Sequence, residues 1–195
     1  MKSMALAGVV LATLALTGCG AELVRDYPAP EAPTLPGTSE RAPADKINLC
    51  TGTLAEVAPS TTDLGLTVSF PDAEVGAKSV SGTVTLTNNG SGTVTGHSGS
   101  RPAVTVSQNG IVLWHSNGGT DLDAVDVDLA PGESIDYPAN FSPVACGVDD
   151  DLAEQFSNRL PPLPSGVYDI SAAIDLVYDG GVDLVTGPSQ KVTLQ

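Results

Sequence analysis

The feature that most constrains the fold is a long run of alternating apolar and polar residues near the end of the chain. In GVYDISAAIDLVY, residues 166–178, the alternating apolar positions are Tyr168, Ile170, Ala172, Ile174, Leu176 and Tyr178. Side chains of a β-strand point alternately to opposite faces, so this pattern predicts a strand with one continuous apolar face. Such a face must be covered by a second layer, which predicts a domain built from packed β-sheets.

Shorter strand patterns, separated by turn residues, precede and follow this run. Val80, Val84 and Leu86 alternate in VSGTVTLT, and Asn88-Asn89-Gly90 ends that strand. Asn109-Gly110 separates AVTVSQ from IVLWHS, and these two residue types favour the positive φ angles of a tight hairpin. The remaining strands are expected at Ile135, Tyr137 and Phe141 after a Pro131-Gly132 turn, and after Asp179-Gly180-Gly181, where a last strand ends near Leu194.

One short helix is predicted between the strands. Leu152, Phe156 and Leu160 lie four residues apart, which places them on one helix face. Asp149, Asp150 and Asp151 precede them, where carboxylates favour a helix N-terminus. The whole pattern predicts an all-β fold, an antiparallel β-sandwich with one short helix.

The start of the chain has a different composition and predicts an exported protein. Lys2 is followed by an apolar run, MALAGVVLATLAL, which is typical of a signal peptide and is shorter than the roughly 20 residues that span a bilayer. Leu16-Thr17-Gly18-Cys19 then resembles the bacterial lipobox, in which the cysteine is lipidated and the leader is cut off before it. We expect residues 1–18 to be a lipoprotein signal peptide, and Cys19 to carry diacylglycerol and palmitate on the extracytoplasmic face of the cell membrane. The alternative is an ordinary secretory leader with a chance cysteine.

Residues 19–47 are predicted to be a disordered tether. They contain Pro28, Pro30, Pro33, Pro36 and Pro43 and few large apolar side chains, a composition that favours extended polyproline conformers over a packed core. The folded domain is expected over residues 48–195. A disordered tail with no spacing role remains an alternative for the tether.

Charge and cysteine content narrow the partners and the compartment. The chain has 8 Lys+Arg and 23 Asp+Glu, and loss of Lys2 with the leader gives 7 − 23 = −16. This charge excludes nucleic acid and anionic lipid surfaces as binding partners. Cys50 and Cys146 are expected to form a disulfide that joins the first strand to the segment after Phe141, because exported domains form disulfides readily. Two separate thiols are the alternative.

No cofactor or metal site is predicted. Asp121, Asp123, Asp126 and Asp128 invite a calcium interpretation, but their order does not match an EF-hand loop, and a solvated acidic segment is the favoured one. His97 and His115 lack zinc-type spacing and belong to no catalytic motif, so we expect no enzyme. Trp114 is expected in the core and His115 on the surface beside it.

Several segments resemble the bacterial intracellular proteinase inhibitor family, whose members are small immunoglobulin-like domains. These segments are TLTNNG, the hairpin from Val106 to Trp114, LAPGES, and LPSGVYDI, whose Tyr168 resembles the tyrosine corner of such domains. The resemblance implies an immunoglobulin-like sandwich, and an inhibitory loop over residues 159–166 in which Arg159 or Leu160 would enter a protease pocket. A weaker likeness is to an uncharacterised domain of actinobacterial lipoproteins.

Three function hypotheses follow. The first is a tethered, non-catalytic binding or structural module that contacts another protein or a cell-wall polymer. The second is a proteinase inhibitor that acts through the proline-rich loop. The third is a calcium-dependent adhesion domain. Inhibition of an intracellular protease does not transfer to this chain, because the leader predicts export.

Overall fold

The computed structural model describes residues 42–116, 123–152, 156 and 159–195. Within these residues, the strands and helices are η1 (Ala44–Lys46), β1 (Leu64–Ser69), β2 (Val80–Asn88), β3 (Val94–Gly99), β4 (Ala103–Gln108), β5 (Ile111–His115), β6 (Ala124–Leu129), β7 (Ser134–Phe141), α1 (Val148–Asp151), β8 (Gly166–Tyr178), β9 (Gly181–Thr186) and β10 (Gln190–Leu194). None of the helices in the described part of the chain is both long enough and apolar enough to cross a bilayer.

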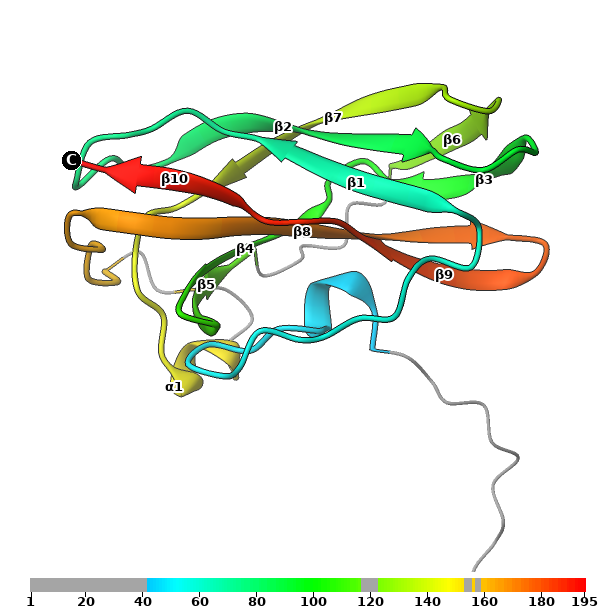
Figure 1. Ribbon diagram of the computed structural model, residues 1–195. Coiled ribbons are helices and arrows are strands. Elements are labelled where there is room, and N and C mark those ends of the chain that lie inside the picture. Colours follow the sequence, from blue (N-terminus) through cyan, green and yellow to red (C-terminus); the bar gives the residue numbers. More distant parts are fainter. Residues whose placement is uncertain (1–41, 117–122, 153–155, 157–158) are drawn as a thin grey trace, which may run out of the picture. The chain divides into compact units, whose positions relative to one another are not determined.

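The strands form two antiparallel sheets that pack face to face (Figure 1). One sheet has the order β1-β2-β7, and the other has the order β5-β4-β8-β3-β6, with β9 and β10 also paired to β8. The chain crosses between the sheets after β2, after β6 and after β7. The predicted fold class, an immunoglobulin-like antiparallel β-sandwich with one short α-helix, is therefore confirmed.

Strand β8 forms the centre of the larger sheet. Its first half pairs with β4 and β10, and its second half pairs with β3 and β9. The side chains of Tyr168, Ile170, Ala172, Ile174 and Leu176 are all buried in the sandwich, as their alternation predicts. The last strand is, however, divided into β9 and β10; between them, the backbone of Leu66 passes so close to Gly187 that no Cβ fits there.

The turns behave as their sequences predict. Asn109 and Gly110 have φ angles of 53° and 77° and connect β4 to β5 in a two-residue hairpin. Gly132, before β7, has a φ angle of 80°. The tyrosine corner is present as well, because the Tyr168 hydroxyl donates to the Pro164 carbonyl oxygen at 2.8 Å.

The buried side chain of Asn88 joins two of the three places where the chain changes sheets, the β2–β3 and β6–β7 connections. Its Nδ2 donates to the carbonyl oxygens of Gly92 (2.7 Å) and Leu129 (2.8 Å), and its Oδ1 accepts from the Gly90 amide at 2.9 Å. The Asn88 amide also donates to the Glu133 carbonyl oxygen, and the Asn88 carbonyl oxygen accepts from the Gly132 amide. One side chain therefore fixes both the β2–β3 and the β6–β7 connections.

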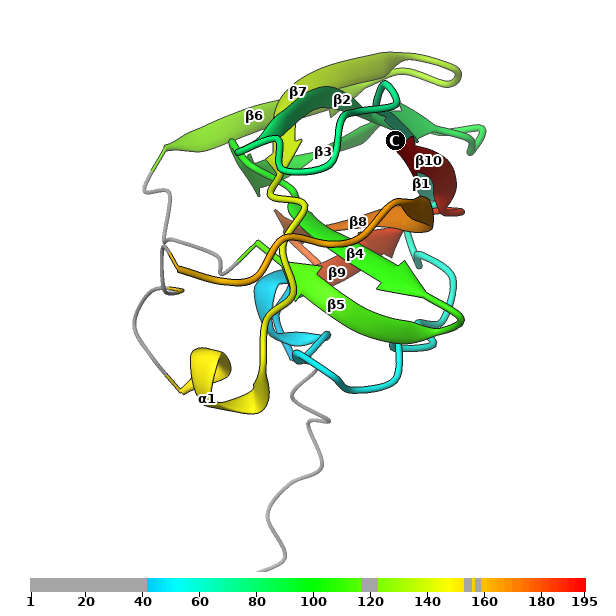
Figure 2. The same ribbon diagram turned by 90° about the vertical axis from the view of Figure 1, so that its left-hand side faces the viewer.

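The outer face of the larger sheet is covered by a third layer. Ala44, Ile47 and Val57 pack on Ala173 and Leu184, which point away from the sandwich core. Figure 2 shows this segment, together with α1, on the side of the sheet opposite β2 and β7. Residues 44–47, which composition assigns to the tether, are thus packed on the sheet, and the folded part of the chain begins before Asn48.

The helix is shorter than its sequence predicts and lies earlier in the chain. α1 ends at Asp151, Leu152 is its C-cap with 83% of its surface exposed, and Phe156 and Leu160 lie outside it. Asp149, Asp150 and Asp151 form the helix rather than precede it. Asp150 accepts from the Gly147 amide at 2.7 Å. Tertiary contacts of Asp151, described below, fix this single turn. The spacing of Leu152, Phe156 and Leu160 therefore does not determine where the helix lies.

Candidate functional site

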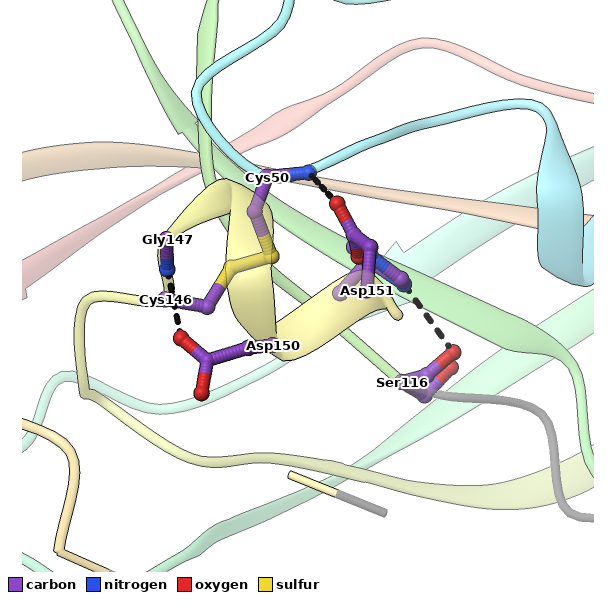
Figure 3. The surroundings of a disulfide bond; sticks show 7 residues. Cys50, Ser116, Cys146, Gly147, Asp150 and Asp151 are labelled. Atoms are coloured by element: carbon purple, nitrogen blue, oxygen red, sulfur yellow. Dashed lines mark hydrogen bonds and ion pairs between the residues drawn. A yellow bond between two sulfur atoms is a disulfide. The ribbon is translucent and has the colours of Figure 1, made fainter. Parts of the chain in front are cut away.

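The expected disulfide between Cys50 and Cys146 is present and buried (Figure 3). It links two segments with Cα atoms 5.6 Å apart, which are separated by 96 residues in sequence. Cys146 lies between β7 and α1, as expected. Cys50 lies in a turn that precedes β1 and not in a strand, which corrects the prediction; the turn is held by a bond from the Gly52 amide to the Leu49 carbonyl oxygen at 3.0 Å.

Both linked segments are hydrogen-bonded to β5, which ends the strand order of its sheet. The amide of Thr51 donates to the Val112 carbonyl oxygen, and the amide of Val112 donates to the Gly52 carbonyl oxygen, both at 2.9 Å. The amide of Cys146 donates to the Leu113 carbonyl oxygen at 2.8 Å. The disulfide therefore joins two covers of the same edge strand, and these covers protect β5 from pairing with another chain.

His115, at the end of β5, lies beside the disulfide and is only 5% exposed. Its Nε2 lies 2.7 Å from Oδ1 of Asp151, and the ring of Phe156 packs edge-on at 5.1 Å between centroids. The other carboxylate oxygen of Asp151 accepts from the Cys50 amide at 2.8 Å. The prediction that His115 is on the surface is wrong. Strand alternation does turn the ring away from the sandwich core, but α1 and the Cys50 turn cover it.

These contacts bring three potential metal ligands together. Cys50 Sγ, a ring nitrogen of His115 and a carboxylate oxygen of Asp151 all lie within 4.8 Å of one another, and no other group of this kind occurs among the described residues. The sequence contains no motif that predicts this group, because its members come from three separate segments. Only the position of His115 directly after the core residue Trp114 and the Cys50–Cys146 pairing point toward it.

Three large aliphatic side chains are exposed at positions that neighbour this group in the sequence. Leu49 precedes Cys50, Leu152 follows Asp151, and Val148 follows Cys146 by two positions. Their exposed fractions are 56%, 83% and 61%. We call Leu49, Val148 and Leu152 the apolar patch. Asp149, which is also exposed, lies within the same helix turn.

The proline-rich loop at residues 159–166 is anchored at two points. The Ala145 amide donates to the Pro161 carbonyl oxygen at 2.8 Å, and the Leu163 amide donates to the Pro143 carbonyl oxygen at 2.9 Å. Leu163 is buried, and Leu160 is half-buried against the core. Arg159 is exposed at the surface. Of the two candidate protease-binding residues, the structure thus presents Arg159 outward, while Leu160 faces the core.

The described aspartates of the acidic segment do not belong to this group of ligands. Asp121 lies outside the described residues, as does Cys19. Asp126 and Asp128 are exposed on β6, and Asp126 Oδ1 lies 2.9 Å from Nδ1 of His97 on β3. Trp114 is buried in the core, as expected, with an edge-on contact to Phe156.

Comparisons with known proteins do not assign a family. No family model matches the chain, and no curated protein matches its sequence. Similar solved structures include the CARDB domain of the PF1109 protein from Pyrococcus furiosus, with 17% identity over 72% of this chain and 95% of that chain, at a TM-score of 0.35. A β-glucosidase from Listeria innocua has 12% identity and a TM-score of 0.36 over 71% of this chain, but only 17% of the glucosidase is covered. The fold is therefore assigned from the strand pairing itself.

Proposed function

We propose that this chain is a lipoprotein anchored at the extracytoplasmic face of the cell membrane, and that its immunoglobulin-like domain is a non-catalytic module that binds another protein. The observation that carries the binding proposal is the apolar patch, three exposed aliphatic side chains beside a buried cross-link. The anchoring proposal rests on the order of charge, apolar run and lipobox around Cys19.

The apolar patch has the properties of a protein-binding surface. Leu49 and Val148 belong to the segments that the disulfide joins, and Leu152 directly follows Asp151, which bonds to both His115 and the Cys50 amide. A backbone fixed in this way loses little conformational entropy when a partner binds. Apolar anchors surrounded by polar groups are typical of interfaces. Because Asp149 is exposed here and the mature chain has a net charge of −16, the partner should offer an apolar pocket bordered by basic residues.

The placement of the two histidines of the chain supports a non-catalytic role. Both ring nitrogens of His115 face oxygen atoms of the domain, Asp151 Oδ1 and the Ser116 carbonyl. His97 is on an exposed strand, where it pairs with Asp126. Among the described residues, the two rings face carboxylates and a backbone carbonyl, and the cysteine beside His115 is held in the disulfide, which is not the nucleophile–base pairing that nucleophilic catalysis requires.

A capture experiment with matched variants tests the binding proposal. Residues 20–195 would be immobilised and exposed to an envelope extract of the producing organism. The wild-type chain should retain a stoichiometric protein that the Leu49→Ser, Val148→Ser, Leu152→Ser variant loses. Val177→Ser with Val182→Ser is the control, because these side chains are 51% and 61% exposed on the β8–β9 hairpin. Equal retention by the patch variant, or retention of a cell-wall polymer alone, would contradict the proposal.

Proteinase inhibition is a second candidate, favoured by the exposure of Arg159 beside the exposed Pro161, Pro162 and Pro164. Prolines and two backbone bonds restrict this loop before a protease binds, which lowers the entropy cost of binding. Titration of trypsin-like and subtilisin-like proteases checks it. Stoichiometric inhibition that is lost in Arg159→Ala and kept in Leu160→Ala would support the candidate, whereas slow cleavage of the loop would reject it.

A further inference from the structure

We propose that reduction of the Cys50–Cys146 disulfide opens a zinc site, whose ligands are the two thiolates, His115 Nε2 and a carboxylate oxygen of Asp151. Three of these ligand groups lie within 4.8 Å of one another, and the fourth, Cys146 Sγ, is covalently attached to Cys50 Sγ. Two thiolates, one imidazole and one carboxylate are all established zinc ligands, and four ligands complete a tetrahedral site.

The geometry of the buried group fits such a site with small movements. Zinc–sulfur and zinc–nitrogen bonds of about 2.3 and 2.0 Å place tetrahedral ligands roughly 3 to 4 Å apart. The ligand atoms of Cys50, His115 and Asp151 are already within 4.8 Å of one another, and the two sulfurs, which are bonded in the disulfide, move apart after reduction to reach the same spacing. The side chains of His115 and Asp151 are 7% and 11% exposed, and the cysteines are 2% and 5% exposed. The site is thus shielded from water on all four ligands.

The groups around His115 also favour Nε2 as the ligand atom. Nδ1 of His115 faces the carbonyl oxygen of Ser116 at 3.4 Å. Zinc-binding histidines commonly donate their second ring N–H to such a carbonyl, which fixes the tautomer and the ring orientation. The carboxylate of Asp151 is oriented in the same way, because its second oxygen accepts from the Cys50 amide. These contacts orient two ligands before any metal arrives.

The chemical change is balanced by a dithiol reductant. A dithiol transfers two electrons and two protons to the disulfide, giving two thiols, and becomes a cyclic disulfide itself. Zinc then displaces the two thiol protons, the Nε2 proton that bonds to Asp151 moves to Nδ1, and the neutral imidazole and the ionised carboxylate complete the site. The ion would tie the same two segments to β5 that the disulfide ties in the oxidised domain. The domain would therefore keep this cross-link under both oxidising and reducing conditions.

Cobalt titration tests the site directly. Residues 20–195, which exclude Cys19, would be reduced with a dithiol, desalted without oxygen and titrated with Co²⁺. We expect one Co²⁺ per chain, with visible bands of tetrahedral cobalt and a thiolate-to-cobalt band in the ultraviolet, all abolished by Zn²⁺. The oxidised chain should show none of these bands. A reduced chain that gives no tetrahedral spectrum would overturn the proposal.

Variants distinguish a four-ligand site from binding by the thiols alone. His115→Gln and Asp151→Asn keep polar groups at both positions and would be purified with the disulfide intact, so their folding is verified by thermal unfolding before reduction. Each should weaken Zn²⁺ affinity by at least tenfold in chelator competition, while His97→Gln, on the exposed strand β3, should leave it unchanged. Unchanged affinity in both site variants would show that the two thiols alone bind the metal and would reject the proposed site.

Discussion

Among single residues, Asp183 on β9 is the most strongly bonded carboxylate described. It is 1% exposed, and its oxygens accept from the hydroxyls of Ser60 and Thr62, both at 2.6 Å, and from the amides of Thr61 and Thr62, both at 3.1 Å. Burial raises the pKa of Asp183, but these hydrogen bonds outweigh it and lower the pKa to about 2. Asp183 therefore holds the segment that leads into β1.

Asp183→Asn should destabilise the domain at neutral pH by about 2 kcal/mol, since the pKa is lowered from 3.8 to about 2 and each pKa unit corresponds to about 1.4 kcal/mol. A lowered folded-state pKa gives stability that is present above pH 4 and is lost as the pH falls toward 2. Urea unfolding between pH 2 and pH 7 checks both points. The wild-type chain should lose this contribution in acid, and the variant should lack it throughout.

Asp175→Asn on the neighbouring strand is the matched control. Burial, the largest effect, raises the pKa of Asp175; the bond from the Ala44 amide lowers it, and Asp45 raises it further. The neutral asparagine can still accept that bond and avoids the cost of a buried charge, so stability at pH 7 should change by less than about 0.5 kcal/mol or should increase. Equal losses in the two variants would contradict this account of Asp183.

The tyrosine corner gives a second prediction for a single residue. Tyr168→Phe removes the hydroxyl that donates to Pro164 but keeps the buried ring, so unfolding free energy should fall by about 1 kcal/mol. Tyr178→Phe, at the half-buried end of the same strand, is the control and should have a smaller effect. Chemical denaturation of the two variants measures the difference. A larger loss for Tyr178→Phe would show that the corner does not stabilise the domain.

Among the elements of the fold, the β2–β3 and β6–β7 connections depend on Asn88. Asn88→Asp keeps the acceptor for the Gly90 amide but loses both donated bonds, and it places a carboxylate oxygen near the buried carbonyls of Gly92 and Leu129. We expect a loss of about 2 to 4 kcal/mol, because unpaired buried acceptors and a buried charge both cost free energy. Asn89→Asp, at an exposed position, is the control and should change stability by under about 0.5 kcal/mol. Thermal and urea unfolding provide the measurements.

The edge strand β5 depends on its two covers and on the disulfide between them. On the chain-entropy model, closing a loop of 96 residues stabilises the domain by about 4 to 5 kcal/mol. Reduction in the presence of a chelator, or Cys50→Ser with Cys146→Ser, should therefore lower the melting temperature. Alkylation of the unreduced folded domain should label neither cysteine. Full labelling would contradict the cross-link.

The sequence predicts the elements that depend on local patterns and fails where distant segments meet. Alternation finds β8, Asn109-Gly110 finds the β4–β5 hairpin, and Gly166 with Tyr168 finds the tyrosine corner, because each pattern is contained within a few neighbouring residues. The burial of His115 and the early end of α1 depend on contacts between β5, the Cys50 turn and Asp151. No local pattern records these contacts, so the candidate metal site could not be predicted even though both cysteines could be paired.

For the whole molecule, the arrangement of leader, Cys19, proline-rich segment and domain predicts a protein held at the membrane by lipid alone. In Cys19→Ser, no thiol is available for lipidation, so the chain should remain unprocessed or be released. Mass spectrometry of the native protein should show an N-terminal cysteine with diacylglycerol. Because two acyl chains anchor a protein stably where one is marginal, the native protein should stay on membranes in high salt and leave them in detergent. A mature chain of net charge −16 is repelled by an anionic bilayer, so an ionic attachment to the membrane is unfavourable. Release by salt alone would nevertheless indicate such an attachment and would refute the lipid anchor.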